Sequence, residues 1–396
     1  MLGARAALGP VGTGGRLVTG AGTSQLPGAA YAVALAGLPL LGWARLAALL
    51  NGREPHNVWR SVLAGRAVTD EAVAAACRRG PGGDAVGEVW RQAATRVDVA
   101  GLWSAHASLG IGVHLKGEPG YPDALDQDAQ APAVLFSLGQ LEALERPRVA
   151  VIGTRRCTHY GREVAAELGH DLAAAGVSVV SGLAYGIDGA AHHGACAAGA
   201  GAPIGIVASG LDVIYPPRHA KLWQAVAERG VLLSEAPLGT RPDGWRFPTR
   251  NRLIAALGQA LVVVESHAGG GSMHTVEAAA QRSRPVLAVP GSVHSPSSVG
   301  TNQLLADGCH PAVDARDVLV ALGLESRAGE TPRRRGARQA TGPDADVLEA
   351  VGWEPTALDV VLDRTGKRLG EVAVALDRLA ERGLVRAGGG WWERAR

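Results

Sequence analysis

The sequence predicts an α/β protein whose core is a doubly wound, mostly parallel sheet, joined to a helical N-terminal domain and a small C-terminal domain. The prediction depends on short runs of Val, Ile and Leu that alternate with stretches of helical pattern. Runs without polar alternation are typical of strands buried on both faces, as in parallel sheets covered by helices. Most of the runs end in Gly or Ser, which is typical of strand-to-helix turns.

These runs and the helices between them define the core in chain order. The predicted strands are VAVIG (149–153), VSVVSG (177–182), IGIVASG (204–210), VLLS (231–234), LVVVES (261–266) and VLAVPG (286–291). The helices are expected to begin near Gly161, Asp188, Arg218, Thr249, Met273 and Val299. We expect Asp188 to cap its helix, because aspartate is a preferred N-cap residue.

The regions that precede the core differ from it in composition. Residues 1–28 are rich in Gly, Ala and Thr, which predicts a disordered segment. Residues 29–145 are predicted to form a helical domain and its connection to the core at 146–325, with a break at Leu38-Pro39. In this domain, a helix, a short Gly-containing turn and a second helix together resemble a helix-hairpin-helix unit. The alternative is an ordinary helical cap that packs on the core.

The C-terminal part begins with a polar, arginine-rich linker at residues 326–343. Residues 344–396 then show three short helical patterns and a hairpin signature, which is the order of a winged helix. In the hairpin, the turn 388–390 separates Leu384-Val385 from Trp391-Trp392. Because acidic residues outnumber basic ones in this domain, we expect it to serve protein contacts or dimer regulation and not to bind duplex DNA.

The overall charge is uninformative until its distribution is considered. The 396 residues carry a formal net charge of +2, and 47% hydrophobic with 19% charged residues excludes a chain-wide disordered or collagen-like protein. Basic residues gather in the N-terminal segment and the linker, whereas the helical and C-terminal domains are net acidic. The total therefore does not exclude a nucleic-acid partner.

Cysteine spacing and hydropathy exclude some other classes. The cysteines (Cys77, Cys157, Cys196 and Cys309) lie far apart with no CxxC pair, so we expect no metal, no cofactor and a reducing, cytoplasmic location. The uncharged stretch 17–44 contains glycines and two prolines and no clean apolar run of about 20 residues, so we expect no membrane span.

Turns at the carboxyl ends of the predicted strands form the candidate site. In order, they contain Gly153, Thr154, Arg155 and Arg156, then Ser181 and Gly182, then Gly271 and Ser272. Glycine lets backbone N–H groups approach a ligand, and helix N-termini favour anions. Because parallel strands share one carboxyl edge, these turns predict a phosphate-binding edge. The alternative is that any doubly wound sheet needs glycines at such turns.

Basic side chains are predicted at the same edge. Besides Arg155 and Arg156, they are Arg218, His219, Lys221, Arg246, Arg250 and Arg252. A row of guanidinium groups suits the successive phosphates of a strand better than a single nucleotide. Tyr185, Trp245 and Phe247 lie among them and can stack on bases, although each alone is more often a core residue. Asn251 is either a base-edge donor or a turn former.

Catalytic motifs are few. The sequence contains no GxxxxGK[ST] phosphate loop, no GxGxxG and no HExxH. Glu277, in GGGSMHTVEAA, lies beside a predicted phosphate turn, where a carboxylate can assist N-glycosidic bond cleavage. A surface glutamate favoured by the helix dipole is the alternative. A nucleotide-processing, phosphoribohydrolase-like enzyme using Glu277 is therefore the second hypothesis.

Seven segments between residues 148 and 310 share the order and spacing of one family's motifs. They are VAVIGTRRCTHYG, VSGLAYGIDGAAHHGA, ASGLDVIYPPRHAKLW, LLSEAPLG, FPTRNRLIAAL, GGGSMHTVEAA and VPGSVHSPSSVGTNQLLADGC. Together they resemble the DNA-processing protein A family, also called the Smf family. The helical N-terminal and winged-helix-like C-terminal regions are also similar to those of many members.

The resemblance implies a Rossmann-like core that binds single-stranded DNA without known catalysis. It also implies that members protect incoming strands in natural transformation, load a RecA-type recombinase and form homodimers, with Leu304 and Leu305 at the dimer contact. By matching motif, 153–156 correspond to the phosphate turn, 218–221 to a nearby basic contact and 250–252 to the RNR segment. A non-enzymatic, single-stranded-DNA-binding recombination mediator is therefore the leading hypothesis.

The sequence departs from the family pattern at three places, one of which is GGSMHT (270–275), where many members have SGSLIT, so that Glu277 is a local feature of this chain. Cys157-Thr158-His159 stands where the family usually has serine or proline, and Pro217 stands where a basic residue is common. The departure at Pro217 transfers the expected basic contact to Arg218 or Lys221.

Overall fold

The structure is a computed structural model, and it describes residues 26–326, 344–352 and 355–394. The chain divides into two compact units, Met1–Thr331 and Pro332–Arg396, and each is described by itself. Most of the predicted disordered segment (1–28) and nearly all of the linker (326–343) lie outside the described residues.

A nine-stranded sheet forms the centre of the first unit, in the order β1-β2-β6-β5-β4-β3-β7-β8-β9. Neighbouring strands from β6 to β9 run parallel, whereas β1 and β2 are antiparallel additions at the β6 edge. The strands are β1 (Gly112–Leu115), β2 (Val134–Gly139), β3 (Arg148–Ile152), β4 (Ser178–Ser181), β5 (Ile204–Ile206), β6 (Val231–Ser234), β7 (Ala260–Val263), β8 (Val286–Ala288) and β9 (His310–Pro311). The predicted mostly parallel sheet is thereby confirmed.

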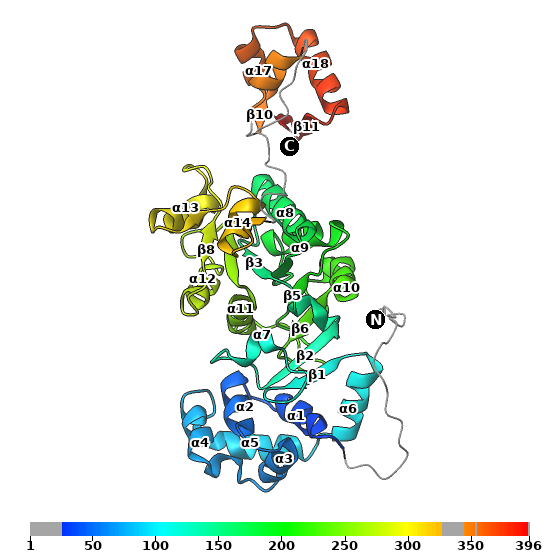
Figure 1. The fold of residues 1–396 in the computed structure, drawn as a ribbon, viewed down its shortest axis with the longest axis vertical. Helices are drawn as coiled ribbons and strands as arrows, with labels where there is room; N and C mark the ends of the chain where they lie inside the picture. Colours follow the sequence, from blue (N-terminus) through cyan, green and yellow to red (C-terminus); the bar gives the residue numbers. More distant parts are fainter. Residues whose placement is uncertain (1–25, 327–343, 353–354, 395–396) are drawn as a thin grey trace. The chain divides into compact units, whose positions relative to one another are not determined.

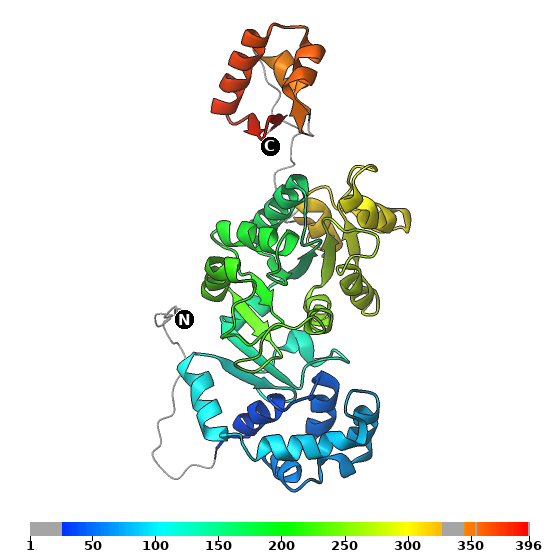
Figure 2. The same ribbon diagram turned by 180° about the vertical axis from the view of Figure 1, so that it is seen from behind.

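Helices cover both faces of this sheet, which explains the strand runs without polar alternation. Val149 and Val151 of β3 pack in one core cluster with α8 (His159–Ala174), α9 (Ile187–Ala197) and α14 (Ala315–Ala321). Ala150 and Ile152 pack in the opposite cluster with α11 (Arg246–Leu257), α12 (Met273–Ala280) and α13 (Val299–Ala306). The helices flank the strands in Figure 1 and in the reverse view of Figure 2.

The predicted helix starts agree with the structure at Met273 and Val299 and differ slightly elsewhere. The helix expected near Gly161 begins at His159, because the Thr158 side chain caps it by accepting from the Gly161 N–H. The helix expected near Thr249 begins at Arg246. At Arg218 a short 3-10 helix, η4 (Pro217–His219), precedes α10 (Ala220–Arg229).

The strand order reverses between β3 and β7. The chain runs outward from β3 through β4 and β5 to β6, and α11 then carries it back to β7 on the other side of β3. In open α/β sheets, ligands bind beyond the carboxyl ends of the strands at such a switch point.

The N-terminal region is helical, and its helices pack at the β1–β2 edge of the sheet (Figures 1 and 2). Its helices are α1 (Gly28–Ala36), α2 (Trp43–Leu50), α3 (Pro55–Leu63), α4 (Glu71–Arg78), α5 (Val86–Ala94) and α6 (Val99–Ser108). The predicted break at Leu38-Pro39 separates α1 from α2. Because β2 pairs with β6 and β1 pairs with β2, the sheet begins at Gly112, inside the range predicted as helices and connection.

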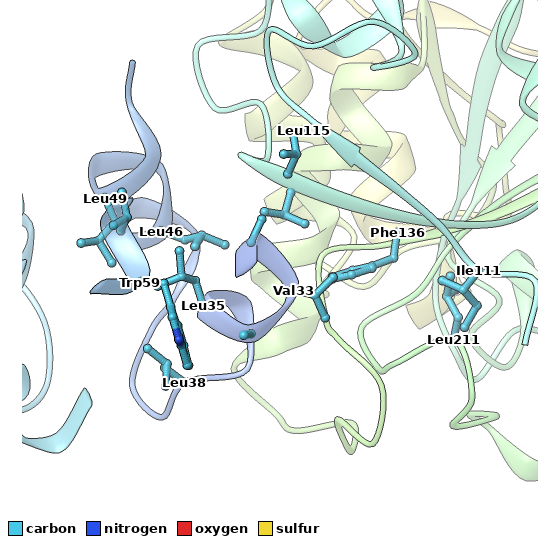
Figure 3. Packing of buried hydrophobic residues seen from close by; sticks show 14 of the residues in the cluster. Val33, Leu35, Leu38, Leu46, Leu49, Trp59, Ile111, Leu115, Phe136 and Leu211 are labelled. Carbon is cyan, nitrogen blue, oxygen red and sulfur yellow. The ribbon is translucent and has the colours of Figure 1, made fainter. Parts of the chain in front are cut away.

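One apolar cluster joins this helical region to the sheet. Val33, Leu35 and Trp59 of the helices share it with Phe136 of β2 and Leu211 of the loop after β5 (Figure 3). Short 3-10 helices and one α-helical turn complete the unit: η1 (Ala67–Thr69), η2 (Gly83–Ala85), α7 (Asp123–Asp126), η3 (Leu141–Leu144) and η5 (Pro296–Ser298).

The residues of the second unit that the structure describes have their own core and form three helices and a three-stranded antiparallel sheet. The elements are α16 (Ala345–Ala350), β10 (Thr356–Ala357), α17 (Leu358–Thr365), α18 (Leu369–Glu381), β11 (Val385–Gly388) and β12 (Trp391–Arg394). Their order matches the predicted helices and hairpin, while the assignment to the winged-helix class stays a prediction. In the described parts of both units, no helix is long and apolar enough to span a membrane.

Candidate nucleic-acid interface

Hydrogen bonds join α11 and the loops at the carboxyl ends of β3, β5 and β7. The Thr154 N–H donates to the Glu265 carbonyl (2.8 Å), which joins the turn after β3 to the turn after β7. Arg250 of α11 donates to the Ile206 carbonyl at the end of β5 (2.6 Å). Asn251 reaches the Gly271 carbonyl (3.5 Å), so α11 also contacts the glycine-rich turn.

Arginines and aromatic rings alternate on this surface. The Arg155 guanidinium carbon lies 4.5 Å from the centroid of the Phe247 ring, and the Tyr215 ring lies 5.6 Å from the same ring. Arg246 lies 4.4 Å above the Trp245 ring, which is 53% exposed. We name these five residues the arginine–aromatic surface. It combines positive charge with planar rings, as a surface for single-stranded nucleic acid requires.

A second group of predicted residues lies beside α10. Arg218 and Lys221 are exposed, as a phosphate contact requires. His219 is held in place, because its Nδ1 bonds to the Leu183 carbonyl (2.9 Å) and its ring lies edge-on to Tyr185. The structure therefore leaves two of the three predicted basic side chains accessible.

Arg250 is buried, although its guanidinium forms part of the wall of a small pocket. The lining residues of this pocket are Gly182, Ala184, Val207, Ala208, Ser209, Tyr215, Pro216, Pro242, Phe247 and Arg250. Burial lowers the pKa of Arg250 to about 10, and the nearby Asp188 carboxylate opposes that shift. A Cβ at Gly182 would overlap this guanidinium, so glycine at that position lets Arg250 cross the end of β4.

We expected Asp188 to cap α9, and the structure shows that it does not. The N-cap position belongs to Gly186, and the Asp188 carboxylate accepts from the Gly182 N–H (3.2 Å) in the preceding loop. Burial raises the pKa of Asp188, and the guanidinium groups of Arg250 and Arg155 oppose that rise. Asp188 is thus a buried carboxyl group close to Arg250 and Arg155.

Arg252 is buried and does not lie on the arginine–aromatic surface, although its partner Glu235 directly follows β6 at the carboxyl edge. Its guanidinium pairs with Glu235, donates to the Gln130 carbonyl (2.6 Å) and lies 4.6 Å above the Trp43 ring. Two residues along a helix turn by about 200°, so Arg250 and Arg252 point to nearly opposite sides of α11. Arg252 contacts the N-terminal helical region instead of the open edge.

Several backbone amides assigned to phosphates already have acceptors within the chain. The Arg156 N–H donates to Thr154 Oγ1 (3.2 Å), and Thr154 and Gly182 are bonded as described above. A Cβ at Gly153 would lie 2.6 Å from the Ile187 side chain and 2.7 Å from the Glu265 carbonyl. Close packing therefore accounts for Gly153 and Gly182, and the guanidinium groups are the exposed hydrogen-bond donors of this edge.

Two predicted hydroxyl groups are likewise occupied. Ser181 Oγ donates to the Val151 carbonyl (2.6 Å), and Ser272 Oγ bonds to Ser266 Oγ (2.8 Å), both in buried surroundings. Gly271 is exposed beside Asn251. The predicted residues brought together on the open surface are therefore Arg155, Arg156, Arg246, Phe247, Asn251 and Gly271.

Glu265 organises the site, and sequence patterns did not predict this role. Its buried carboxylate accepts from the Thr158 N–H (2.9 Å) and from the Thr158 hydroxyl. A Cβ at Gly161 would overlap that carboxylate, so Gly161 allows α8 to begin against it. The available signal was an acidic residue at the end of an otherwise apolar strand run, LVVVES.

The remaining predicted residues lie away from this surface or inside the core. Glu277 is exposed on α12. Leu304 is buried and Leu305 is partly buried, and both pack in the same apolar cluster of this chain. Among the described residues, no group of three or more His, Cys, Asp and Glu side chains could hold a metal ion.

Fold and site together define an open α/β protein whose switch-point edge presents arginines beside aromatic rings. Residues 112–323 match the family model of DNA recombination-mediator protein A. The chain is 39% identical over 267 residues to the putative DNA processing protein DprA of Mycobacterium tuberculosis, covering 66% of this chain and 68% of that protein. It is 36% identical over 282 residues to protein Smf of Escherichia coli, covering 70% and 75%. The chain belongs to the DNA recombination-mediator protein A family.

A solved structure agrees with this assignment. The X-ray structure of DNA processing protein A from Streptococcus pneumoniae aligns with a TM-score of 0.62 and 29% identity, covering 75% of this chain and 98% of that chain. The predicted family is therefore confirmed. The family is described as one of recombination mediators, which disfavours the phosphoribohydrolase-like alternative based on Glu277.

Proposed function

We propose that this protein binds single-stranded DNA at the carboxyl edge of its sheet. The observation that carries the proposal is the arginine–aromatic surface, in which Arg155 and Arg246 lie over the rings of Phe247 and Trp245. Unstacked bases can lie on such rings while guanidinium groups bind the phosphates between them. Bases within a duplex are stacked on each other and do not offer their faces in this way.

We also propose that the bound strand is passed to a RecA-type recombinase, and that the protein acts as a cytoplasmic homodimer in natural transformation or recombination. Membership in a family of recombination mediators supports the loading step. Relatives named as DNA processing proteins support a DNA substrate. In this chain Leu304 and Leu305 pack mostly inside their own core, so Leu305, which keeps partial exposure, is the better candidate for a dimer contact.

A salt titration of oligo-dT binding tests the DNA site. For single strands the slope of log K against log salt is about −0.7 per phosphate contact, so the Arg155→Ala/Arg156→Ala variant should flatten it by about 1.4. The matched control is Arg78→Ala/Arg79→Ala, which removes two exposed arginines from the end of α4. An unchanged slope in the first variant, or an equal change in the control, places the DNA elsewhere.

A strand-exchange assay tests the loading step separately. A RecA-type recombinase is added to single strands already coated with a single-strand-binding protein, and the lag before filament growth is measured. The native protein should shorten the lag, and the Arg155→Ala/Arg156→Ala variant should not. If the native protein binds oligo-dT and the lag is unchanged, binding stands and loading is wrong.

A further inference from the structure

Arg252 connects three segments that are far apart in the sequence. It pairs with Glu235 in the loop after β6, bonds to Gln130 before β2 and lies over Trp43 of α2 in the N-terminal helical region. Its side chain is 8% exposed in this ion pair. A buried guanidinium with a carboxylate, a carbonyl and a ring around it has one favourable position.

The same helix carries the DNA-facing residues. Arg246 and Phe247 lie in the first turn of α11 and Arg250 in the next, while Arg252 anchors the helix from its other side. A shift of α11 at Arg252 therefore moves the arginine–aromatic surface as well. Because cores are close-packed, such a helix moves as a body.

Apolar packing makes a second connection between the helical region and the site. Leu183, in the loop after β4, and Val207 and Leu211, after β5, belong to the cluster formed by Val33 and Leu35 of α1. Figure 3 shows Leu211 on the sheet side of this cluster, across from the α1 side chains. Leu183 is fully buried, and its carbonyl accepts the bond that holds His219. The loops that form the open edge thus have the helical region behind them.

We propose that the N-terminal helical region holds the DNA-binding edge in its binding shape, with Trp43 and Arg252 as positioning residues. The inference rests on the proposed binding of single-stranded DNA. Arg252 touches no DNA in this arrangement and acts by fixing α11. Loss of the Trp43–Arg252 contact should weaken binding without changing the number of phosphates contacted.

The test measures oligo-dT affinity and its salt slope for variants of the full chain. Trp43→Leu keeps an apolar side chain and removes the ring, so we expect affinity to fall roughly three- to thirtyfold with an unchanged slope. Trp43→Phe keeps a ring face for the guanidinium and should bind nearly as the native chain does. Trp103→Leu, a half-buried tryptophan of α6 in the same region, is the matched control and should bind normally.

Stoichiometric titration and thermal melting exclude misfolding as the cause. Equal binding by Trp43→Leu and the native chain overturns the inference, and so does an equal loss in Trp103→Leu. The variant Arg252→Gln, which removes the charge, should lower affinity at constant slope, whereas a slope flattened by about 0.7 would make Arg252 a direct phosphate contact and also overturn it. If Arg155→Ala/Arg156→Ala binds normally, the proposed DNA site is wrong and the inference that rests on it is wrong too. If only Trp43→Leu binds normally, the inference alone is wrong and the proposed DNA site stands.

Discussion

Arg155 lies over one face of the Phe247 ring, with 4.5 Å between its guanidinium carbon and the ring centroid. Arg155 comes from the turn after β3 and Phe247 from the first turn of α11, so the contact joins the two sides of the strand-order reversal. A guanidinium in this position orients the ring and keeps N–H groups free for phosphate. The pair therefore combines the charge and the stacking surface that the proposed function needs.

Replacing Phe247 by Leu should weaken oligo-dT binding and leave its salt slope unchanged. Stacking of a base on an aromatic side chain contributes about 1–3 kcal/mol, and the phosphate contacts do not depend on the ring itself. Phe247→Tyr keeps the ring and should bind as the native protein does. A native affinity for Phe247→Leu would show that no base stacks there.

Replacing Gly182 by Ala should destabilise the protein by about 1–3 kcal/mol in denaturant unfolding. The added Cβ would overlap the Arg250 guanidinium, which must then leave the Ile206 carbonyl and the vicinity of Asp188. Gly244→Ala is the control, because a Cβ there meets nothing within 4 Å. Equal unfolding free energies for the two variants would mean that Arg250 moves aside without cost.

Stability should fall on acidification because of His192. Burial lowers the pKa of this histidine from 6.5 to about 4, so between these values the unfolded chain binds a proton that the folded chain does not. The folded chain therefore has its full stability above pH 6.5, where His192 is neutral in both states. It loses stability as the pH falls toward 4, and the free energy of unfolding should decrease by about 2 kcal/mol from pH 7 to pH 5. His192→Leu should lose about that much less stability over this interval, measured by urea unfolding at both pH values. The same pH dependence in both proteins would exclude His192 as its source.

Removal of residues 344–396, which contain the described part of the second unit, should leave oligo-dT affinity and salt slope unchanged. The exposed side of α18 carries Glu371, Asp377 and Glu381, which repel phosphates. The same titration as for the full chain measures the effect. A tenfold loss of affinity, or a slope flattened by one contact or more, would assign DNA binding to this unit.

The arrangement of the core could be predicted from the sequence because its signals are local. Val149 to Ile152 is apolar at every position, and this pattern indicates a strand covered on both faces, as the structure has it. Gly and Ser at the ends of such runs marked the edge where the loops meet. The motifs of the core were also sufficient to identify the family.

The direction of individual side chains could not be predicted in the same way. Arg250 and Arg252 are two residues apart in one helix. The structure places Arg250 near Asp188 and Arg252 over the Trp43 ring, and these partners are far away in the sequence. The role of Glu265 depends on Thr158, which lies 107 residues away in the chain. Long-range partners of this kind leave no periodic signal in a sequence.

The adjacency of β3 and β7 has a consequence for synthesis on the ribosome. The Arg148 N–H at the start of β3 bonds to Gln259, just before β7, across 111 residues of chain. A nascent chain that has been synthesised as far as β6 contains the turn with Arg155. It does not yet contain Phe247 or Glu265, which contact this turn in the folded protein. The surface therefore assembles late, after α11 and β7 have emerged, and an unfinished chain meets cellular nucleic acids without a formed binding site.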